Sequence, residues 1–344
     1  MPHAAGHFRT FVGLLVCLSG AMAPLPERAL AGEPPASPER IHALRLAGEL
    51  NEARRLASAS LEAPGLEPEL EIALRLELAR IEDRIGLHRN ARPVAEMLRQ
   101  VEAAKVLAAD ASLAARARVE SALAQYHYRA EEAGREFALA AAHAERAAEM
   151  FREAGDRHGE AEAVHQLGLV HLRRGELDSA RDLFVRSLEL DIEGGARTFF
   201  RGEYERHVGL IELQRGDTAA AIPHFERSLA ARRAAGAIDA SLFAARILAA
   251  ALLDVGRASE AREPLLYALL VAERIDSPVG RARVGITLGE LYEKTHERDA
   301  AIAAYEWAFA AAETVHLESI AARARDALAR LDSTSGESEE VPTL

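Results

Sequence analysis

A motif that returns every 40 residues constrains the fold of this chain more than any other feature. A pair of the Leu-Gly type recurs at steps of 41, 40 and 40 residues, as Leu167-Gly168, Val208-Gly209, Leu248-Ala249 and Leu288-Gly289. Each pair is followed by an alanine and then by a large apolar residue, at Ala180 and Phe184, Ala221 and Phe225, Ala261 and Leu265, and Ala301 and Tyr305. A repeat of this length predicts a helical hairpin that cannot bury its own apolar face, so neighbouring hairpins must stack.

The composition favours helices throughout. Of the 344 residues 49% are hydrophobic but only 5% are aromatic, because alanine and leucine supply much of the apolar content. These are strong helix formers, and little of the sequence alternates as a β-strand would. The sequence therefore predicts an all-α solenoid of about seven antiparallel helix hairpins with a C-terminal capping helix.

The first 31 residues are typical of an export signal. A short polar segment with Arg9 precedes the apolar run 11–18, which is too short to span a bilayer. Cleavage after Ala29-Leu30-Ala31 is preferred to the earlier small-residue site, where Pro24 would follow the scissile bond. An uncleaved N-terminus is the alternative. We expect an exported protein, periplasmic or secreted, without stable membrane insertion.

Cysteine content and charge exclude several classes of function. Cys17 is the only cysteine, and Val16 before it argues against a lipid anchor. Once the signal is removed, the chain has no thiol for a disulfide, a zinc–thiolate site or a nucleophile. The net charge of −12 makes nucleic acid an improbable partner, and an anionic membrane equally so.

Breaks in the pattern divide the chain. The predicted segments are a signal peptide (1–31), a linker (32–37), degenerate helical hairpins (38–154), clear repeats (155–316), a capping helix (317–331) and a disordered acidic tail (332–344). In the degenerate region, turns are predicted near Gly48, Gly86 and Gly134. In the clear array they are predicted at Gly175, Gly216, Gly256 and His296, since glycine is a common helix C-cap.

The small and large positions indicate how the helices pack. Glycine or alanine lets the two backbones of a hairpin approach, and the large residue is expected to fill the space between adjacent hairpins. This pattern resembles the tetratricopeptide repeat (TPR), and 160–192 matches it best. The period of 40 rather than 34, without a proline late in the second helix, looks like the long-period arrays of bacterial maltose-activator-type regulators.

The resemblance implies a right-handed superhelix with a concave groove that binds peptides, protein segments or small ligands. In such proteins positions 2, 5, 9, 12 and 13 of the first helix line the groove. The corresponding candidates for partner binding are His165, Leu169, Leu172, Arg206, Leu210, Leu213, Arg246 and Leu253. They predict an apolar strip beside a short cationic column, in which Arg206 and Arg246 reach one extended acidic ligand. Alternatively, the arginines pair with neighbours such as Glu203, Glu205 or Asp239.

No motif for catalysis or for a metal is evident. The nucleophile elbow, the phosphate-binding loop and the dinucleotide fingerprint are all missing from the sequence. His165 and His171 are six residues apart and so lie on different helix faces, and Ala300 occupies the second ligand position of a zinc-protease-like stretch at His296. We expect no catalytic residue, no metal site and no cofactor, although an enzyme site in the irregular region 110–155 is a third alternative.

The sequence therefore favours an exported, non-catalytic interaction scaffold whose partner is a protein or peptide, with an acidic one suiting the arginines. The alternative function is a periplasmic sensory component that binds a small molecule or a short peptide. Binding of the acidic tail to the protein's own groove is a further hypothesis.

Overall fold

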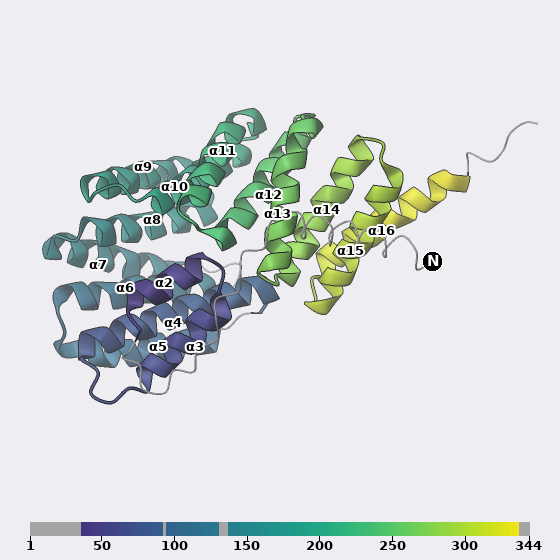
Figure 1. Ribbon diagram of the computed structural model, residues 1–344. Coiled ribbons are helices and arrows are strands. Elements are labelled where there is room, and N and C mark those ends of the chain that lie inside the picture. The colour runs from purple at the N-terminus through teal and green to yellow at the C-terminus, as the bar shows by residue number, and fades with distance from the viewer. Residues whose placement is uncertain (1–35, 92–93, 131–136, 337–344) are drawn as a thin grey trace, which may run out of the picture. The chain divides into compact units, whose positions relative to one another are not determined.

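The computed structural model describes residues 36–91, 94–130 and 137–336, and all regular elements within them are helices (Figure 1). The helices are α2 (Pro38–Leu46), α3 (Leu50–Leu61), α4 (Pro68–Arg89), α5 (Val94–Leu107), the short 3₁₀ helix η1 (Ala108–Asp110), α6 (Leu113–Ala130), α7 (Ala138–Ala154), α8 (Arg157–Arg173), α9 (Leu177–Glu193), α10 (Thr198–Gln214), α11 (Thr218–Ala234), α12 (Ile238–Asp254), α13 (Ala258–Arg274), α14 (Pro278–Lys294), α15 (Arg298–Thr314) and α16 (Glu318–Gly336). The predicted all-α solenoid of stacked hairpins is confirmed. The right-handed superhelix stays a prediction. The predicted signal peptide lies outside the described residues.

Consecutive helices pack in pairs, as in α8 with α9, α10 with α11 and α14 with α15. The turns inside these pairs lie where the sequence predicts them. Gly175 and Gly216 have φ angles of 77° and 82°, which glycine adopts without strain. His296 takes the equivalent place in the last pair with a φ of 60°, so the turn geometry is kept there without glycine.

The small and large repeat residues meet inside each hairpin. A Cβ atom built on Gly168 would lie 2.6 Å from Cε1 of Phe184, closer than side chains approach one another. Gly209 has the same relation to Phe225 at 2.5 Å. Phe184 also packs with Ile211 of the following hairpin. The predicted contact between hairpins is therefore present, and the ring additionally explains why its own hairpin needs glycine.

The degenerate region and the end of the chain differ from prediction in two places. Gly86 lies inside α4 and is buried, so packing keeps the helix intact there. The helix α4 ends at Arg89 and is followed by Asn90, which has a φ of 51°. The helix α16 continues to Gly336 and so includes residues 332–336, which were expected to begin the disordered tail. Gly134 and residues 337–344 lie outside the described part of the chain.

The chain divides into two compact units. The N-terminal unit comprises the described residues of 32–86 and 92–238, and the C-terminal unit comprises 87–91 and the described residues from Asp239 onward. Among the described helices, none combines the length and the apolar character that a bilayer span requires.

Candidate binding faces of the two units

The predicted groove residues lie on first helices of the hairpins, but they differ in exposure. Leu169 and Leu172 of α8 are half-buried against the cluster around Phe184, and Leu210 and Leu213 of α10 are half-buried too. Leu253 of α12 is only 3% exposed and therefore belongs to the core of the C-terminal unit, not to an exposed strip.

His165, another predicted contact, lies in a buried polar cluster of the N-terminal unit. Its ring centroid is 4.8 Å from those of Phe184 and His207, and 5.3 Å from that of Phe200. The side chain is 7% exposed, and neither ring nitrogen has a hydrogen-bond partner. Burial lowers the pKa of His165 to about 4, so the ring is neutral at pH 7.

Glu203 of α10 connects this cluster to two arginines. Its carboxylate lies 2.8 Å from Nη2 of Arg232 and 3.4 Å from Nη2 of Arg206. Burial alone would raise the pKa of Glu203, but the charges of Arg232 and Arg206 outweigh it and hold that pKa well below the ordinary value. Arg206 also donates to Nε2 of His207 at 2.5 Å. Arg206 thus has a partner within the protein, as the alternative interpretation proposed.

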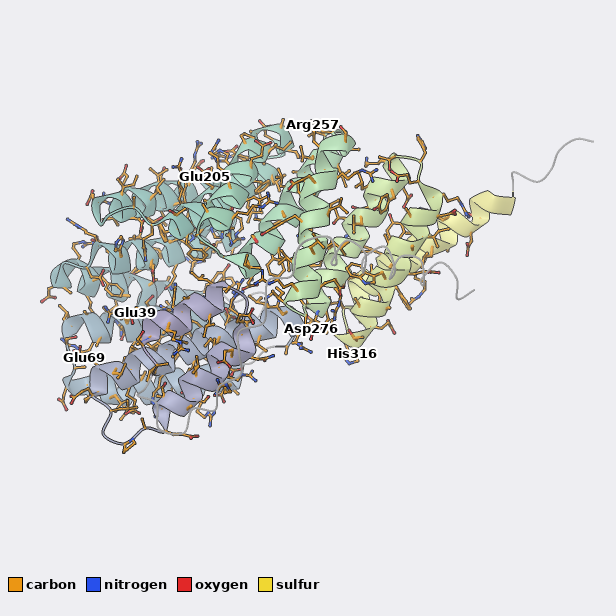
Figure 2. The ribbon with its side chains drawn as sticks, in the orientation of Figure 1. Glu39, Glu69, Glu205, Arg257, Asp276 and His316 are labelled. Carbon is orange, nitrogen blue, oxygen red and sulfur yellow. The ribbon has the colours of Figure 1, made fainter. Side chains whose placement is uncertain are left out.

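Glu205, offered as another partner for Arg206, instead pairs with α11. The two carboxylate oxygens of Glu205, which is labelled in Figure 2, lie 2.8 Å from Nδ1 of His224 and 2.8 Å from Nε of Arg227. Both bonds join the two helices of one hairpin, so this carboxylate serves the packing of α10 on α11.

A chain of ion pairs links first helices within the N-terminal unit. Glu77 of α4 pairs with Arg45 of α2 at 3.1 Å and with Arg80 at 2.6 Å. Arg80 lies 3.9 Å from Glu162 of α8, which also binds Arg197 at 2.6 Å. These half-buried cations are therefore neutralised by carboxylates of the same unit.

The C-terminal unit differs, because two of its arginines have no such partner. Within the described residues, no ion pair or hydrogen bond neutralises Arg246 of α12 or Arg283 of α14, and Nε of Arg246 is buried without a partner. Burial, and then the positive charge of Arg283, lowers the pKa of Arg246 to about 10. Burial also lowers the pKa of Arg283. The two cations therefore lie close enough to repel each other.

A cavity of about 420 Å³ lies near Arg246, since two of its lining residues, Glu290 and Arg323, interact electrostatically with that arginine. Its lining comprises Ile286, Glu290, Glu293, Lys294, Tyr305, Arg323, Asp326, Ala327 and Arg330. Tyr305 donates to Glu293 at 2.5 Å, and Arg323 donates to Glu290 at 2.6 Å. The residues from α16 were missed by sequence reasoning, which treated that helix only as a cap. Arg323 and Arg330 are seven residues apart, and this spacing could have indicated a common face.

Ser277, His88 and Asp239 form a second buried polar network in the C-terminal unit. Nδ1 of His88 lies 2.7 Å from Oγ of Ser277, and its Nε2 lies 2.5 Å from Oδ1 of Asp239. The residue types match a catalytic triad, but all three are at most 3% exposed and Ser277 also caps α14 by accepting from Gly280 N. No substrate reaches a hydroxyl buried in this way, so the network serves packing.

No protein-family model and no curated protein matches the sequence. Among solved structures, the apo form of RapI is 14% identical, with a TM-score of 0.57 over 77% of this chain and 72% of that one. A signal transduction ATPase with a tetratricopeptide repeat sensor, from Pyrococcus horikoshii, is 16% identical, with a TM-score of 0.54 over 88% of this chain and 48% of that one. The Rap conjugation gene regulator of plasmid pLS20, solved with the Phr* peptide, is 12% identical, with a TM-score of 0.52 over 90% of this chain and all of that one. The predicted TPR-like helical-repeat fold is thereby confirmed.

Proposed function

We propose that this chain is a non-catalytic scaffold that binds an acidic peptide or protein segment on the first helices of its C-terminal unit. The observation that carries the proposal is the pair Arg246 and Arg283, two neighbouring cations that no ion pair or hydrogen bond of the described chain neutralises. The negative charge of Glu290 offsets the effect of burial and of Arg283 on Arg246 only in part, since the pKa of Arg246 remains lowered. A ligand carboxylate would relieve both their mutual repulsion and the unmet hydrogen bond of Arg246. The peptide seen in the pLS20 regulator supports a peptide as ligand.

The sequence analysis assigned Arg206 and Arg246 jointly to an acidic ligand, and the present proposal keeps only Arg246 in that role. Arg206 forms an ion pair with Glu203, whereas Arg246 forms no ion pair within the described chain and lies near the like charge of Arg283. The ligand is therefore expected on the C-terminal unit, with the adjoining cavity accepting a side chain or the peptide terminus.

Affinity selection of a displayed random peptide library on the immobilised full chain tests this proposal. We expect enrichment of Asp and Glu, and a loss of affinity of about 10- to 100-fold when those residues are replaced by Asn and Gln in synthetic peptides. The Arg246→Gln, Arg283→Gln variant should show the same loss.

The matched control for this variant is Arg257→Gln, Arg274→Gln, which removes one charge from each end of α13 in the same unit. Arg257 is labelled in Figure 2. It should bind as tightly as the unmodified chain. Equal binding by both double variants, or selection of peptides without carboxylates, would place recognition elsewhere.

The cavity beside α14, α15 and α16 favours a second candidate, which is recognition of a small molecule. Its volume of about 420 Å³ falls in the range of ordinary ligand sites, and charged groups of both signs line it. A thermal-shift screen with zwitterionic metabolites tests this function. A rise in Tm that is lost in Arg323→Gln, while the peptide affinity is kept, would support a sensor rather than a scaffold.

We further propose that the protein is exported and that its mature form begins at Gly32. The support is the sequence of residues 1–31, with its apolar run and its small-residue cleavage site. Expression with the native N-terminus, cell fractionation and N-terminal sequencing test this. Recovery of an intact Met1 in the cytoplasmic fraction would refute it.

A further inference from the structure

We propose that His165, Glu203 and His207 form a site for a divalent transition-metal ion of the zinc type, separate from the peptide site. One ring nitrogen from each histidine and one carboxylate oxygen lie within 4.8 Å of one another. Two imidazoles and one carboxylate are a donor set that Zn²⁺ takes in proteins with an open fourth position.

The unmet hydrogen bonds of the two histidines are the second observation. Both ring nitrogens of His165 and Nδ1 of His207 are buried without a partner. A neutral imidazole has one donor and one acceptor nitrogen, and burying either without a partner is unfavourable. A metal ion accepts the lone pair of one nitrogen of His165, so ligation satisfies a group that the protein leaves unmet. At His207 the ion would take the lone pair of Nε2, which accepts from Arg206 in the absence of metal.

The helices place the three ligands as a metal site requires. Glu203 and His207 are four residues apart and share one face of α10, while His165 comes from α8 in the preceding hairpin. Phe184 stacks on His207 with centroids 5.0 Å apart and also contacts the ring of His165. Ring packing on two helices thus fixes the direction of the ligands before any ion binds.

The positive charges of two arginines beside the proposed ligands disfavour the binding of a cation. Arg232 contacts Oε1 of Glu203, and Arg206 contacts Oε2 and also occupies Nε2 of His207. The Arg206 side chain is 27% exposed and can turn toward solvent, whereas Arg232 is buried. Arg206 therefore competes directly with the ion, and removing its charge should strengthen metal binding.

Titration calorimetry of the untagged full chain, freed of metal by a chelator and titrated with ZnCl₂, tests the site. We expect one ion per chain and a loss of affinity of at least about 10-fold in His165→Phe and in His207→Gln. Phenylalanine fills the volume of His165 among aromatic rings. The control His171→Gln, on the same α8 but paired with Glu176, should leave the affinity unchanged.

Arg206→Gln is the decisive variant, because it should tighten zinc binding by about 10-fold while a structural perturbation would weaken it. The visible absorption of the Co²⁺-loaded protein gives a second readout that requires no variant, since histidine ligation of Co²⁺ produces its own spectrum. Absence of stoichiometric Zn²⁺ binding, or binding that is unaffected in both folded histidine variants, would overturn the proposal. Neither result bears on the peptide site, whose arginines belong to other helices.

Discussion

Gly209→Ala is the substitution that most directly tests how the repeat holds its hairpins together. In an ordinary helix this change stabilises, by about 0.5–1 kcal/mol, because alanine is the better helix former. Here the new Cβ atom would lie 2.5 Å, 2.9 Å and 3.0 Å from three ring atoms of Phe225. The ring must withdraw by about 1 Å to restore ordinary contact near 3.4 Å.

The two effects can be weighed against each other. Overpacking of a filled core costs roughly 1–3 kcal/mol, and Phe225 is only 1% exposed, so it has little room to move. After the gain in helix propensity is subtracted, a net destabilisation of about 1–2 kcal/mol remains. The direction is opposite to that of a glycine-to-alanine change on an open helix face.

The chain itself supplies the compensating variant. In the hairpin of α12 and α13 the equivalent residues are Ala249 and Leu265, and both are fully buried. Gly209→Ala combined with Phe225→Leu recreates that pair. Phe225→Leu alone should cost about 1–2 kcal/mol, and the double variant should be more stable than the sum of the single effects by about 1 kcal/mol or more.

Urea unfolding followed by circular dichroism gives the free energies. Hydrogen exchange of peptides from α10 and α11 gives the local opening, which matters because repeat arrays need not unfold in one step. A neutral or stabilising Gly209→Ala would refute the steric explanation. Strict additivity in the double variant would show that the two positions are not coupled.

Two further predictions concern the N-terminal unit. Burial alone would raise the pKa of Glu77, but the charges and hydrogen bonds of Arg80, His42 and Arg45 outweigh burial and hold that pKa below its ordinary value of 4.5. The ionised Glu77 therefore stabilises the folded protein above pH 4.5, and this contribution is lost as the pH falls toward the folded-state pKa. The Tm should therefore fall between about pH 6 and about pH 3, and less steeply in Glu77→Gln. Asp217→Ala should lower the unfolding free energy by about 1 kcal/mol, because Asp217 caps α11 by accepting from Ala220 N at 2.8 Å, and Asp217→Asn should retain most of it in urea unfolding.

Much of the fold could be predicted from the sequence because the repeat reports local packing. The glycine turns and the small-large pairs recur at fixed spacing, and each reflects contacts inside one hairpin or between adjacent hairpins. Gly86 was misassigned because glycine was taken as a stop signal, whereas burial maintains α4 through it. Local propensity is weaker than tertiary packing at such a position.

The candidate sites were harder to predict because their members come from different repeats. His165 and His207 are 42 residues apart and belong to successive repeats, so a search for local metal-ligand spacing does not connect them. His88 bonds to Asp239 and Ser277, which are 151 and 189 residues away. Arg283 was missed because only equal repeat positions were compared, and it lies three residues before Ile286, the equivalent of Arg246.

The contrast between Arg206 and Arg246 shows how one repeat position acquires two different roles. Three residues before Arg206 stands Glu203, which supplies a counter-ion on the same helix, but three residues before Arg246 stands Phe243. Phe243→Glu should therefore neutralise Arg246 internally and reduce the affinity for an acidic peptide by about 10-fold or more, although neither arginine is changed.

The ring of Phe243 also stacks on His88 with centroids 5.6 Å apart, so any substitution there removes a packing contact. Phe243→Gln is the matched control, since it loses the same ring but adds no charge. If the glutamate variant loses peptide binding and the glutamine variant keeps it, the missing counter-ion on α12 is what makes Arg246 a binding residue. If both variants lose binding equally, the ring and not the charge governs recognition, and the electrostatic explanation fails.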